Sequence, residues 1–307
     1  MQFMTMLDLV VKISFFLTIL GIGLRATTDD VTNLFRRPLR LPGAMIAVFV
    51  IMPLFVWLLA RKLELDPMVE LTLFALAVSP VPLVVPHRVL DTEERESFAL
   101  GQLAAACVLS VFVIPFAFRI INAVFAREPH LPEQSIIAAL LFGVLTPLVL
   151  GMFVGRFASS FADRYAVPIE ALGSVLLVVG LLPILIAFLP TVWTLVENGT
   201  VVAIAAFTVV GIAAGHLLGG PEPFDRAGLA FATSFRHPAI VLALAIANLG
   251  GPETRVVAAT VVLYVLVSGV LTVPYLAWAA REPKGSRDTD TMAAPPQGFT
   301  LSTKNKV

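Results

Sequence analysis

Residues 229–247 read Leu-Ala-Phe-Ala-Thr-Ser-Phe-Arg-His-Pro-Ala-Ile-Val-Leu-Ala-Leu-Ala-Ile-Ala, an apolar stretch interrupted at Arg236, His237 and Pro238. Proline removes a backbone donor and clashes with the preceding turn, so a helix through this stretch is broken there. A charge in the middle of a membrane helix costs about 3 kcal/mol even on lenient scales, and it normally faces a cavity or a partner. No carboxylate nearby in the sequence suggests itself as a partner for Arg236. We therefore expect a broken membrane helix with a functional charge at the break.

A second apolar stretch is interrupted in a similar way. Residues 79–88 read Ser-Pro-Val-Pro-Leu-Val-Val-Pro-His-Arg, and a regular helix cannot pass unbroken through three prolines in seven residues. In hydrocarbon, the carbonyl groups freed by such a break are tolerated only where protein or a water-filled cavity surrounds them. Interrupted helices at corresponding positions of two halves are the best sequence indication of a transporter's central site.

The composition is that of a membrane protein. Hydrophobic residues make up 58% of the 307 positions, charged residues make up 14%, and the mean hydropathy is +0.92. A soluble domain has about 45–50% apolar and about 25% charged residues, so too little polar surface would remain to cover this chain in water. The net charge of zero gives no indication of a nucleic-acid partner. The single cysteine, Cys107, excludes an intramolecular disulfide and a cysteine-based metal cluster.

Nine apolar stretches are long enough to cross a bilayer as helices, which requires about 20 residues each. They are residues 7–24, 43–62, 68–89, 98–121, 134–154, 168–190, 199–218, 225–248 and 255–280. We therefore predict an all-α membrane protein with about nine transmembrane helices within residues 1–281. Residues 282–307 are polar and are predicted to form a disordered cytoplasmic tail.

The distribution of lysine and arginine between the loops predicts the orientation. One set of loops and the tail hold most of the 21, namely Arg25, Arg36, Arg37, Arg40, Arg88, Arg95, Arg156, Arg164, Arg226, Arg281, Lys284, Arg287, Lys304 and Lys306. The opposite loops hold Arg61, Lys62, Arg127 and Arg255. The richer side is predicted to be cytoplasmic, which places the N-terminus outside and the C-terminus inside. We expect the protein in the plasma or inner membrane.

The residues at the two interruptions are the candidate substrate-binding residues, because open helix ends offer backbone donors, acceptors and dipole charge. The predicted set is Pro80, Pro82, Pro86, His87, Thr233, Ser234, Arg236 and His237. Its positive side chains favour an anionic ligand. In the alternative interpretation, Arg88 extends to the cytoplasmic interface and His237 only caps a helix. Lys12 and Ser14 in the first span are further candidates to face the cavity.

Short motifs along the chain are similar to those of a known family. They are Gly21-Ile-Gly-Leu24, Leu34-Phe-Arg-Arg-Pro38, Ile51-Met-Pro53, Pro147-Leu-Val-Leu-Gly151 and the stretch 232–245. On these motifs, over roughly residues 7–280, the chain resembles the bile acid:sodium symporter family of secondary transporters. The resemblance implies two inverted repeats whose crossing, interrupted helices are the third and eighth spans. It also implies a core domain and a panel domain, with core spans at about 43–121 and 199–280 and panel spans at about 7–24 and 134–190.

The chain departs from this family at the positions that bind sodium in its sodium-coupled members. The family's Ser and Asn of the first crossover fall at Val85 and Pro86, and its Glu and Asn of the second fall at Ala232 and His237. Sodium, like other hard cations, requires several oxygen ligands, and the side chains of Val, Pro and Ala supply none. The departures imply that the sodium sites are absent and that Arg236 and the histidines supply the positive charge instead.

These observations predict a secondary transporter that moves a small organic anion by alternating access, without the family's usual sodium coupling. Proton coupling is an open alternative, since histidine titrates near neutral pH and His87 or His237 would line the cavity. A non-transporting receptor or scaffold on a transporter-derived fold is a second alternative, and a transporter of another fold with broken helices is a third. The sequence contains no H-E-x-x-H, no G-x-S-x-G and no Walker-type glycine loop, so we expect no enzymatic activity, no cofactor and no bound metal. The expected partners are the anion and the lipid bilayer.

Overall fold

The computed structural model describes residues 2–27, 40–79, 108–110, 113–116, 119 and 133–281. The regular structure in these residues is helical, which confirms the predicted all-α class. The first half contains α1 (Gln2–Arg25), a continuous segment of α3 (Arg40–Ile46), η1 (Ala47–Ile51) and α4 (Met52–Lys62), and then α5 (Pro67–Val78). The second half contains α7 (Glu133–Leu140), η3 (Leu141–Leu145), α8 (Thr146–Phe157), α9 (Ser159–Ala187), α10 (Leu189–Glu197), α11 (Thr200–Leu218), α12 (Pro223–Ser234), α13 (Ala239–Asn248) and α14 (Gly251–Ala279).

Two long helical segments contain a π-helical turn that ends two residues before a proline. The turn η1 precedes Pro53, and the turn η3 precedes Pro147. A proline inside a helix lacks a donor and crowds the carbonyl four residues earlier. A π turn gives the backbone local room at that point, so the helix continues through the proline.

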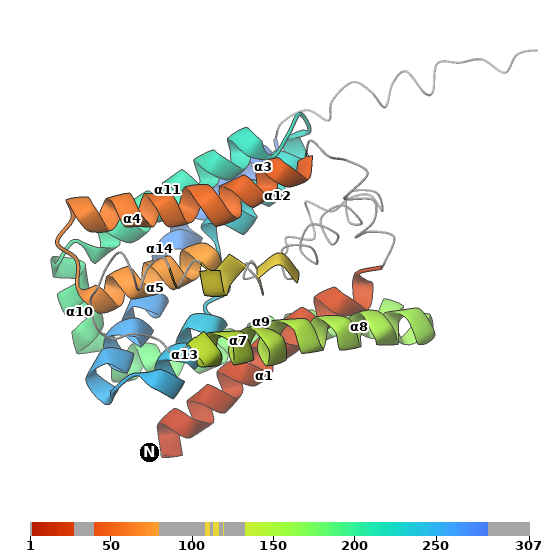
Figure 1. Ribbon diagram of the computed structural model, residues 1–307, viewed down its shortest axis with the longest axis horizontal. Coiled ribbons are helices and arrows are strands. Elements are labelled where there is room, and N and C mark those ends of the chain that lie inside the picture. The colour runs from red at the N-terminus through yellow and green to blue at the C-terminus, as the bar shows by residue number, and fades with distance from the viewer. Residues whose placement is uncertain are drawn as a thin grey trace, which may run out of the picture.

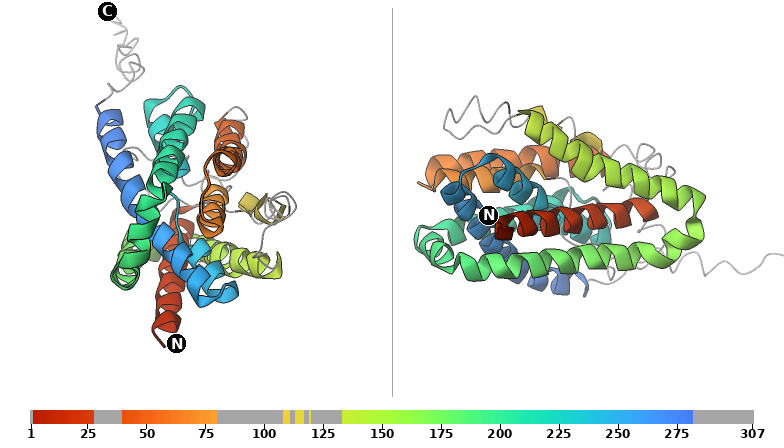
Figure 2. Two further views of the ribbon diagram at one scale, coloured as in Figure 1. Left: turned by 90° about the vertical axis from the view of Figure 1, so that its left-hand side faces the viewer. Right: turned by 90° about the horizontal axis from the view of Figure 1, so that it is seen from below.

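Helix α1 packs between α8 and α9, as the right-hand view of Figure 2 shows. Glycines bring these three helices into direct backbone contact. A Cβ atom on Gly151 of α8 would lie 2.6 Å from the Leu20 carbonyl oxygen, and one on Gly173 of α9 would lie 2.7 Å from the Ser14 carbonyl oxygen. Small residues at helix crossings allow such close approach in membranes. The three helices therefore form one tightly packed layer.

The second group of helices surrounds α11, which contacts α4, α12 and α14 (Figure 1). Gly211 and Gly215 of α11 lie against the backbone of α12. The short helix α13 joins the two groups, since it contacts α1 and α7 on one side and α5 and α14 on the other. The break between α12 and α13 consequently lies where the two groups of helices meet. The division into panel and core domains stays a prediction.

The predicted spans agree with the described helices in part. Four helical stretches are long and apolar enough to cross a membrane, namely Pro42–Lys62, Ser159–Ala187, Thr200–Leu218 and Gly251–Ala279. Helix α9 begins nine residues before the predicted 168–190 span, and α10 was not predicted as a separate helix. Most of the 98–121 span and all of 282–307 lie outside the described residues, so the count of nine and the disordered tail stay predictions.

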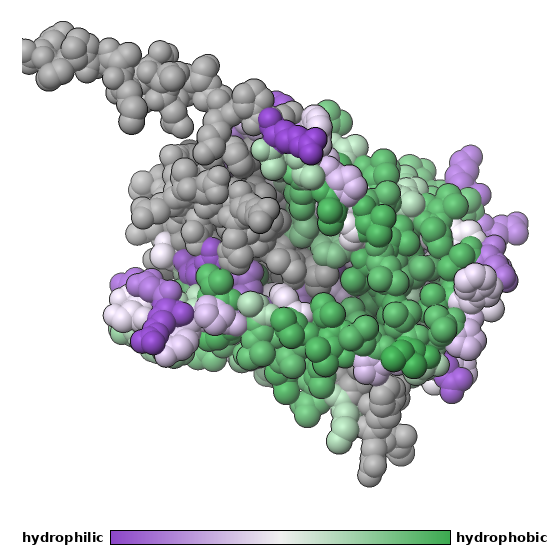
Figure 3. All heavy atoms as spheres, turned by 180° about the vertical axis from the view of Figure 1, so that it is seen from behind, coloured by the Kyte–Doolittle hydropathy of each residue, from purple (hydrophilic) through white to green (hydrophobic). Residues whose placement is uncertain are grey.

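The surface is that of a protein embedded in lipid. Figure 3 shows a broad apolar band between two polar edges. Large apolar side chains are exposed in this protein, with Phe142, Ile186 and Leu217 each more than 70% accessible. Soluble monomers rarely expose contiguous apolar areas of this extent. The chain is therefore an all-α membrane protein.

Candidate functional site

The two interruptions predicted from the sequence come together in the structure. Helix α12 ends at Ser234 and α13 begins at Ala239, with four non-helical residues between them. Helix α5 ends at Val78, and the next residue, Ser79, has an extended backbone. The Ser79 hydroxyl donates to the carbonyl of His237 over 3.4 Å, although the two residues are 158 positions apart. The predicted site residues Pro80, Pro82, Pro86 and His87 lie outside the described residues.

Arg236 connects the ends of both broken helices. Its side chain is fully buried, its Nη1 donates to the carbonyl of Ser79, and its Nε donates to the carbonyl of Thr233 over 3.2 Å. The last carbonyls of a helix lack intrahelical donors and carry partial negative charge. No carboxylate of the described residues pairs with Arg236. The guanidinium therefore balances the C-terminal dipoles of α5 and α12 rather than a side-chain anion.

Tyr264 of α14 satisfies the backbone on the other side of the break. Its fully buried hydroxyl accepts from the Arg236 backbone N–H over 2.5 Å and donates to the Ser234 carbonyl over 3.0 Å. Backbone groups freed inside a membrane need such partners. Tyr264 is not among the residues predicted from the sequence. The sequence contains a weak indication of this role, because a tyrosine in an apolar stretch usually places its buried hydroxyl against a hydrogen-bond partner.

The other predicted residues of the second break are buried, and their hydrogen-bonding groups face protein backbone. Thr233 donates to the Gly211 carbonyl over 2.5 Å, and Ser234 donates to the Ala230 carbonyl over 2.7 Å. The Nδ1 atom of His237 accepts from the N–H of Ala239, the first residue of α13, over 3.3 Å. That these residues also contact the substrate stays a prediction.

Two buried nitrogens at the break have unused hydrogen-bonding capacity. Arg236 Nη2 and His237 Nε2 have no hydrogen-bond partner within the part of the chain that the structure describes. Buried polar atoms are nearly always paired in folded proteins, so unpaired ones call for an explanation. The ring of His237 lies against Phe15 of α1, with 4.9 Å between the ring centroids. The break thus reaches the boundary between α13 and α1.

A pocket of about 420 Å³ lies at that boundary, among α1, α7, η3 and α13. The side chains that line it are mainly apolar or aromatic, and Lys12 is the charged one among those described. They are Lys12, Phe15, Phe16, Ser135, Ala138, Phe142, Gly143, Ala239, Ala243, Leu244, Ala247 and Asn248. Ser135 donates to the Asn248 amide oxygen over 2.9 Å. This volume lies in the usual range for small-molecule sites.

The pocket tests the two further candidates of the first span. Lys12 lines it, as the sequence analysis expected. Ser14 does not, because its side chain is fully buried and its hydroxyl donates to the Gly173 carbonyl of α9 over 2.7 Å. Residues two positions apart in an α-helix lie about 200° apart around its axis, so Lys12 and Ser14 point to opposite sides of α1.

Discontinuous helices that meet inside a bundle beside a pocket are typical of secondary transporters. Comparison with known proteins gives the family. The model of the Sodium Bile acid symporter family matches residues 12–189, more than half of the chain, and the chain belongs to this family of membrane transporters.

Individual relatives are more distant. The Sodium/bile acid cotransporters 7-A and 7-B of Xenopus laevis and cotransporter 7 of Xenopus tropicalis are each 26% identical to the chain over 159 residues. Each of these matches covers 50% of this chain and 46% of the relative. The chain thus spans about half the length of the curated relatives it matches. The match supports common ancestry, while substrate and coupling require evidence from this chain's own residues.

Proposed function

We propose that the protein is a secondary transporter that moves a small organic anion by alternating access, without sodium coupling. The observation that carries the proposal is the buried guanidinium of Arg236 at the meeting point of two broken helices, beside a pocket for a small molecule. The family supports transport as the class of activity. The anion and the lack of sodium coupling rest on the features of this chain argued below.

The pocket favours an amphipathic anion. Phe15, Phe16 and Phe142 offer aromatic surface for an apolar body, and Lys12 offers a positive charge for an acidic group. The amide of Asn248 and the hydroxyl of Ser135 add polar contacts at the same pocket. Ligand sites generally combine apolar walls with a few polar groups that fix orientation. An organic carboxylate or sulfonate matches this combination.

The position of the pocket suits alternating access. Its walls come from α1 and α7 of the proposed panel and from α13 of the proposed core. In transporters built from inverted repeats, one group of helices rocks against the other around a site at their boundary. A rocking motion of the core would therefore open and close this pocket. We assign the opening of the pocket to the outer side of the membrane, because the distribution of lysine and arginine between the loops places Lys12 and Asn248 near that side.

Arg236 is the reason to propose sodium-independent transport. The carbonyls of Ser79 and Thr233 would be natural ligands for a cation between the two breaks, and both accept from the guanidinium. A sodium ion about 4 Å from the guanidinium would be repelled by about 4 kcal/mol at an effective dielectric constant of about 20. The arginine thus acts as a permanently attached cation at this place. We expect the protein in the plasma or inner membrane, with the N-terminus outside.

The test is uptake into proteoliposomes of radiolabelled carboxylates and sulfonates of increasing size, with wild type and two variants. Ala243→Phe fills the pocket, and Ala213→Phe adds the same side chain at an exposed position of α11. We expect Ala243→Phe to reduce uptake at least about tenfold and Ala213→Phe to transport like wild type. Equal transport by both variants would remove the pocket from the route. Absence of uptake by wild type for every anion would favour a receptor or scaffold, because the bonds of Arg236 to helix ends also suit a protein that does not transport.

A further inference from the structure

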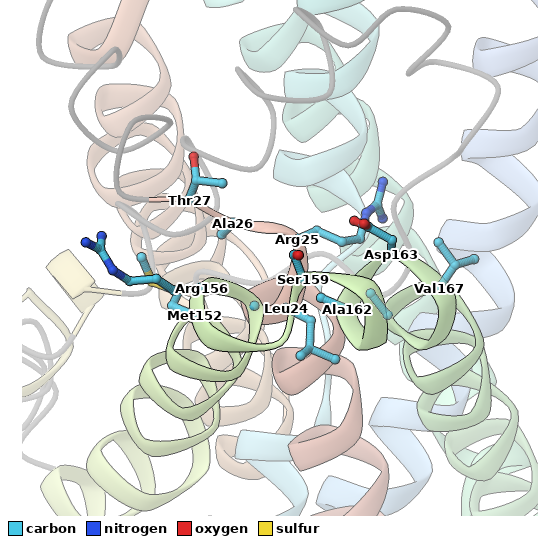
Figure 4. A pocket seen from close by; sticks show the side chains of 12 residues that line it. Leu24, Arg25, Ala26, Thr27, Met152, Arg156, Ser159, Ala162, Asp163 and Val167 are labelled. Carbon is cyan, nitrogen blue, oxygen red and sulfur yellow. The ribbon is translucent and has the colours of Figure 1, made fainter.

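A second cavity lies at the other end of α1. It has a volume of about 530 Å³ and lies among the last turn of α1, the end of α8 and the first turns of α9 (Figure 4). Its polar lining residues are Arg25, Thr27, Arg156, Ser159 and Asp163. The arginines of this end belong to the loops predicted to be cytoplasmic. The two cavities are thus on opposite sides of the proposed membrane path.

Tight packing of α1 separates the two cavities. The outer pocket reaches Phe16 of α1, and the inner cavity begins at Leu24, so about 12 Å of helix lies between them. In this interval α1 is in direct backbone contact with its neighbours. A Cβ atom on Gly21 would lie 2.8 Å from Glu170 Cβ, and one on Gly23 would lie 2.6 Å from the Leu148 carbonyl oxygen. A solute that leaves the outer pocket must therefore pass beside α1 on the side of the core.

The inner cavity contains an ion pair at its wall. Arg25 Nη1 lies 3.2 Å from Glu170 Oε2, and the two side chains are 10% and 4% exposed. Arg25 is among the residues that line the cavity, and Glu170 is not. Figure 4 shows Arg156 of α8 and Asp163 of α9 on opposite sides of the cavity, with Arg25 beside Asp163. A guanidinium carries several N–H donors, so the pair with Glu170 fixes Arg25 at the cavity wall, and the acidic group of a ligand would compete with carboxylates for these donors.

We propose that the inner cavity is a second anion-binding site, in which Arg25 binds the acidic group of the ligand and Glu170 competes with that group. The proposal deepens the proposed function, because it assigns a place where the transported anion is held before release. Glu170 lowers the affinity of the site, which favours release into a compartment where the anion accumulates. The ligand is an organic carboxylate or sulfonate, and a phosphate of an anionic lipid headgroup presents the same chemistry to Arg25.

The test measures binding of 2-naphthalenesulfonate to purified protein by isothermal titration calorimetry, in an Ala243→Phe background that fills the outer pocket. Glu170→Gln removes the competing carboxylate and is expected to tighten binding at least about fivefold. Arg25→Gln is expected to weaken binding at least about tenfold. Arg164→Gln makes the same change of charge at an exposed arginine of α9 that does not line the cavity, and it should leave binding unchanged.

Opposite effects of the two single variants are the result that supports the site. A purely structural ion pair predicts no such opposition, so changes of affinity in the same direction would overturn the proposal. The Arg25→Gln variant also loses the ion-pair partner of the buried Glu170 carboxylate, so the double variant Arg25→Gln/Glu170→Gln is measured as well. If the double variant binds 2-naphthalenesulfonate as tightly as Glu170→Gln alone, Arg25 does not bind the ligand and the proposal is overturned. Absence of binding in the Ala243→Phe background would overturn the inner site while leaving uptake by wild type, and hence the proposed function, intact.

A second arm separates the two sources of the anion. Binding is repeated in nanodiscs of phosphatidylcholine with and without phosphatidylglycerol. If the lipid headgroup occupies the site, phosphatidylglycerol weakens binding of the sulfonate to the Ala243→Phe protein, and the Arg25→Gln variant shows no such competition. If the transported solute is the occupant, the affinity is the same in both lipids and keeps its dependence on Arg25. Both results support the site, and an effect of phosphatidylglycerol that is equal with and without Arg25 contradicts it.

Discussion

Replacing Arg236 with alanine removes the donor that bonds the ends of two broken helices. The carbonyls of Ser79 and Thr233 are then left without this partner inside the protein. An unsatisfied buried acceptor costs about 1–3 kcal/mol, so the two together cost about 2–6 kcal/mol. Loss of the buried charge also removes its desolvation cost, which offsets part of the sum. We expect a net loss of about 2–3 kcal/mol, or a fall of about 4–6 °C in Tm at about 2 °C per kcal/mol.

The assay is thermal unfolding of the purified protein in detergent, followed by tryptophan fluorescence. The cavity left by the side chain retains its carbonyl acceptors, so free guanidinium ions at about 10–50 mM should enter it and raise Tm towards the wild-type value. Potassium chloride at the same concentration corrects for ionic strength. Arg226→Ala is the matched control, because Arg226 Nε donates to the Gly220 carbonyl over 2.7 Å at a partly buried position outside the break.

Arg226→Ala is expected to lower Tm by about 2 °C or less and to show no recovery with guanidinium. If Arg236→Ala were as stable as Arg226→Ala, the guanidinium of Arg236 would not stabilise the two helix ends as proposed. The same would follow if guanidinium raised the Tm of both variants equally, since recovery specific to position 236 is what a cation held between two helix ends predicts.

Three further predictions concern the packing and the pocket. Tyr264→Phe removes the hydroxyl that bonds two backbone groups at the break, so it should destabilise the protein by about 2–4 kcal/mol in the same thermal assay; an unchanged Tm would contradict that role. Gly151→Ala forces a Cβ atom against the backbone of α1 and should lower the free energy of unfolding by about 1–3 kcal/mol. Gly228→Ala on α12 is the control, because nothing lies within 4 Å of the new Cβ, and it should be neutral or stabilise the protein by up to about 1 kcal/mol. Equal effects of the two variants would be evidence against the close contact. Lys12→Gln should raise the KM of anion uptake about two- to fivefold with little change in Tm, and an unchanged KM would exclude Lys12 from ligand binding.

The interruption at residues 235–238 could be predicted from sequence, because its signal is local. Arg236 and Pro238 each conflict with an unbroken apolar helix, and the structure ends α12 and begins α13 on either side of them. Residues 79–88 likewise predicted a break, and α5 ends at Val78. The hydrogen bond between the two breaks could not be predicted from either stretch, because Ser79 and Arg236 meet only through the fold of the whole bundle.

The pocket could not be predicted because its walls come from α1, α7, η3 and α13, which are far apart in the chain. Phe15 and Phe142 are ordinary residues of apolar stretches, and nothing in those stretches distinguishes a phenylalanine that lines a pocket from one that contacts lipid. The early start of α9 was missed for a different reason. Asp163 and Arg164 resemble loop residues, yet they lie on helical turns at the polar edge of the membrane band, where charged side chains remain in contact with water.

We propose that the fixed guanidinium of Arg236 takes the place of a coupling sodium ion in an anion transporter. The most direct measurement is the initial rate of uptake of the best transported anion into proteoliposomes, with sodium outside, with potassium in its place, and with an imposed pH gradient, for wild type and Arg236→Ala. We expect wild type to transport equally well in sodium and in potassium, and Arg236→Ala to lose most of its uptake in both. A wild-type rate that falls at least about tenfold when potassium replaces sodium would show that sodium is coupled to transport and that the guanidinium does not replace it.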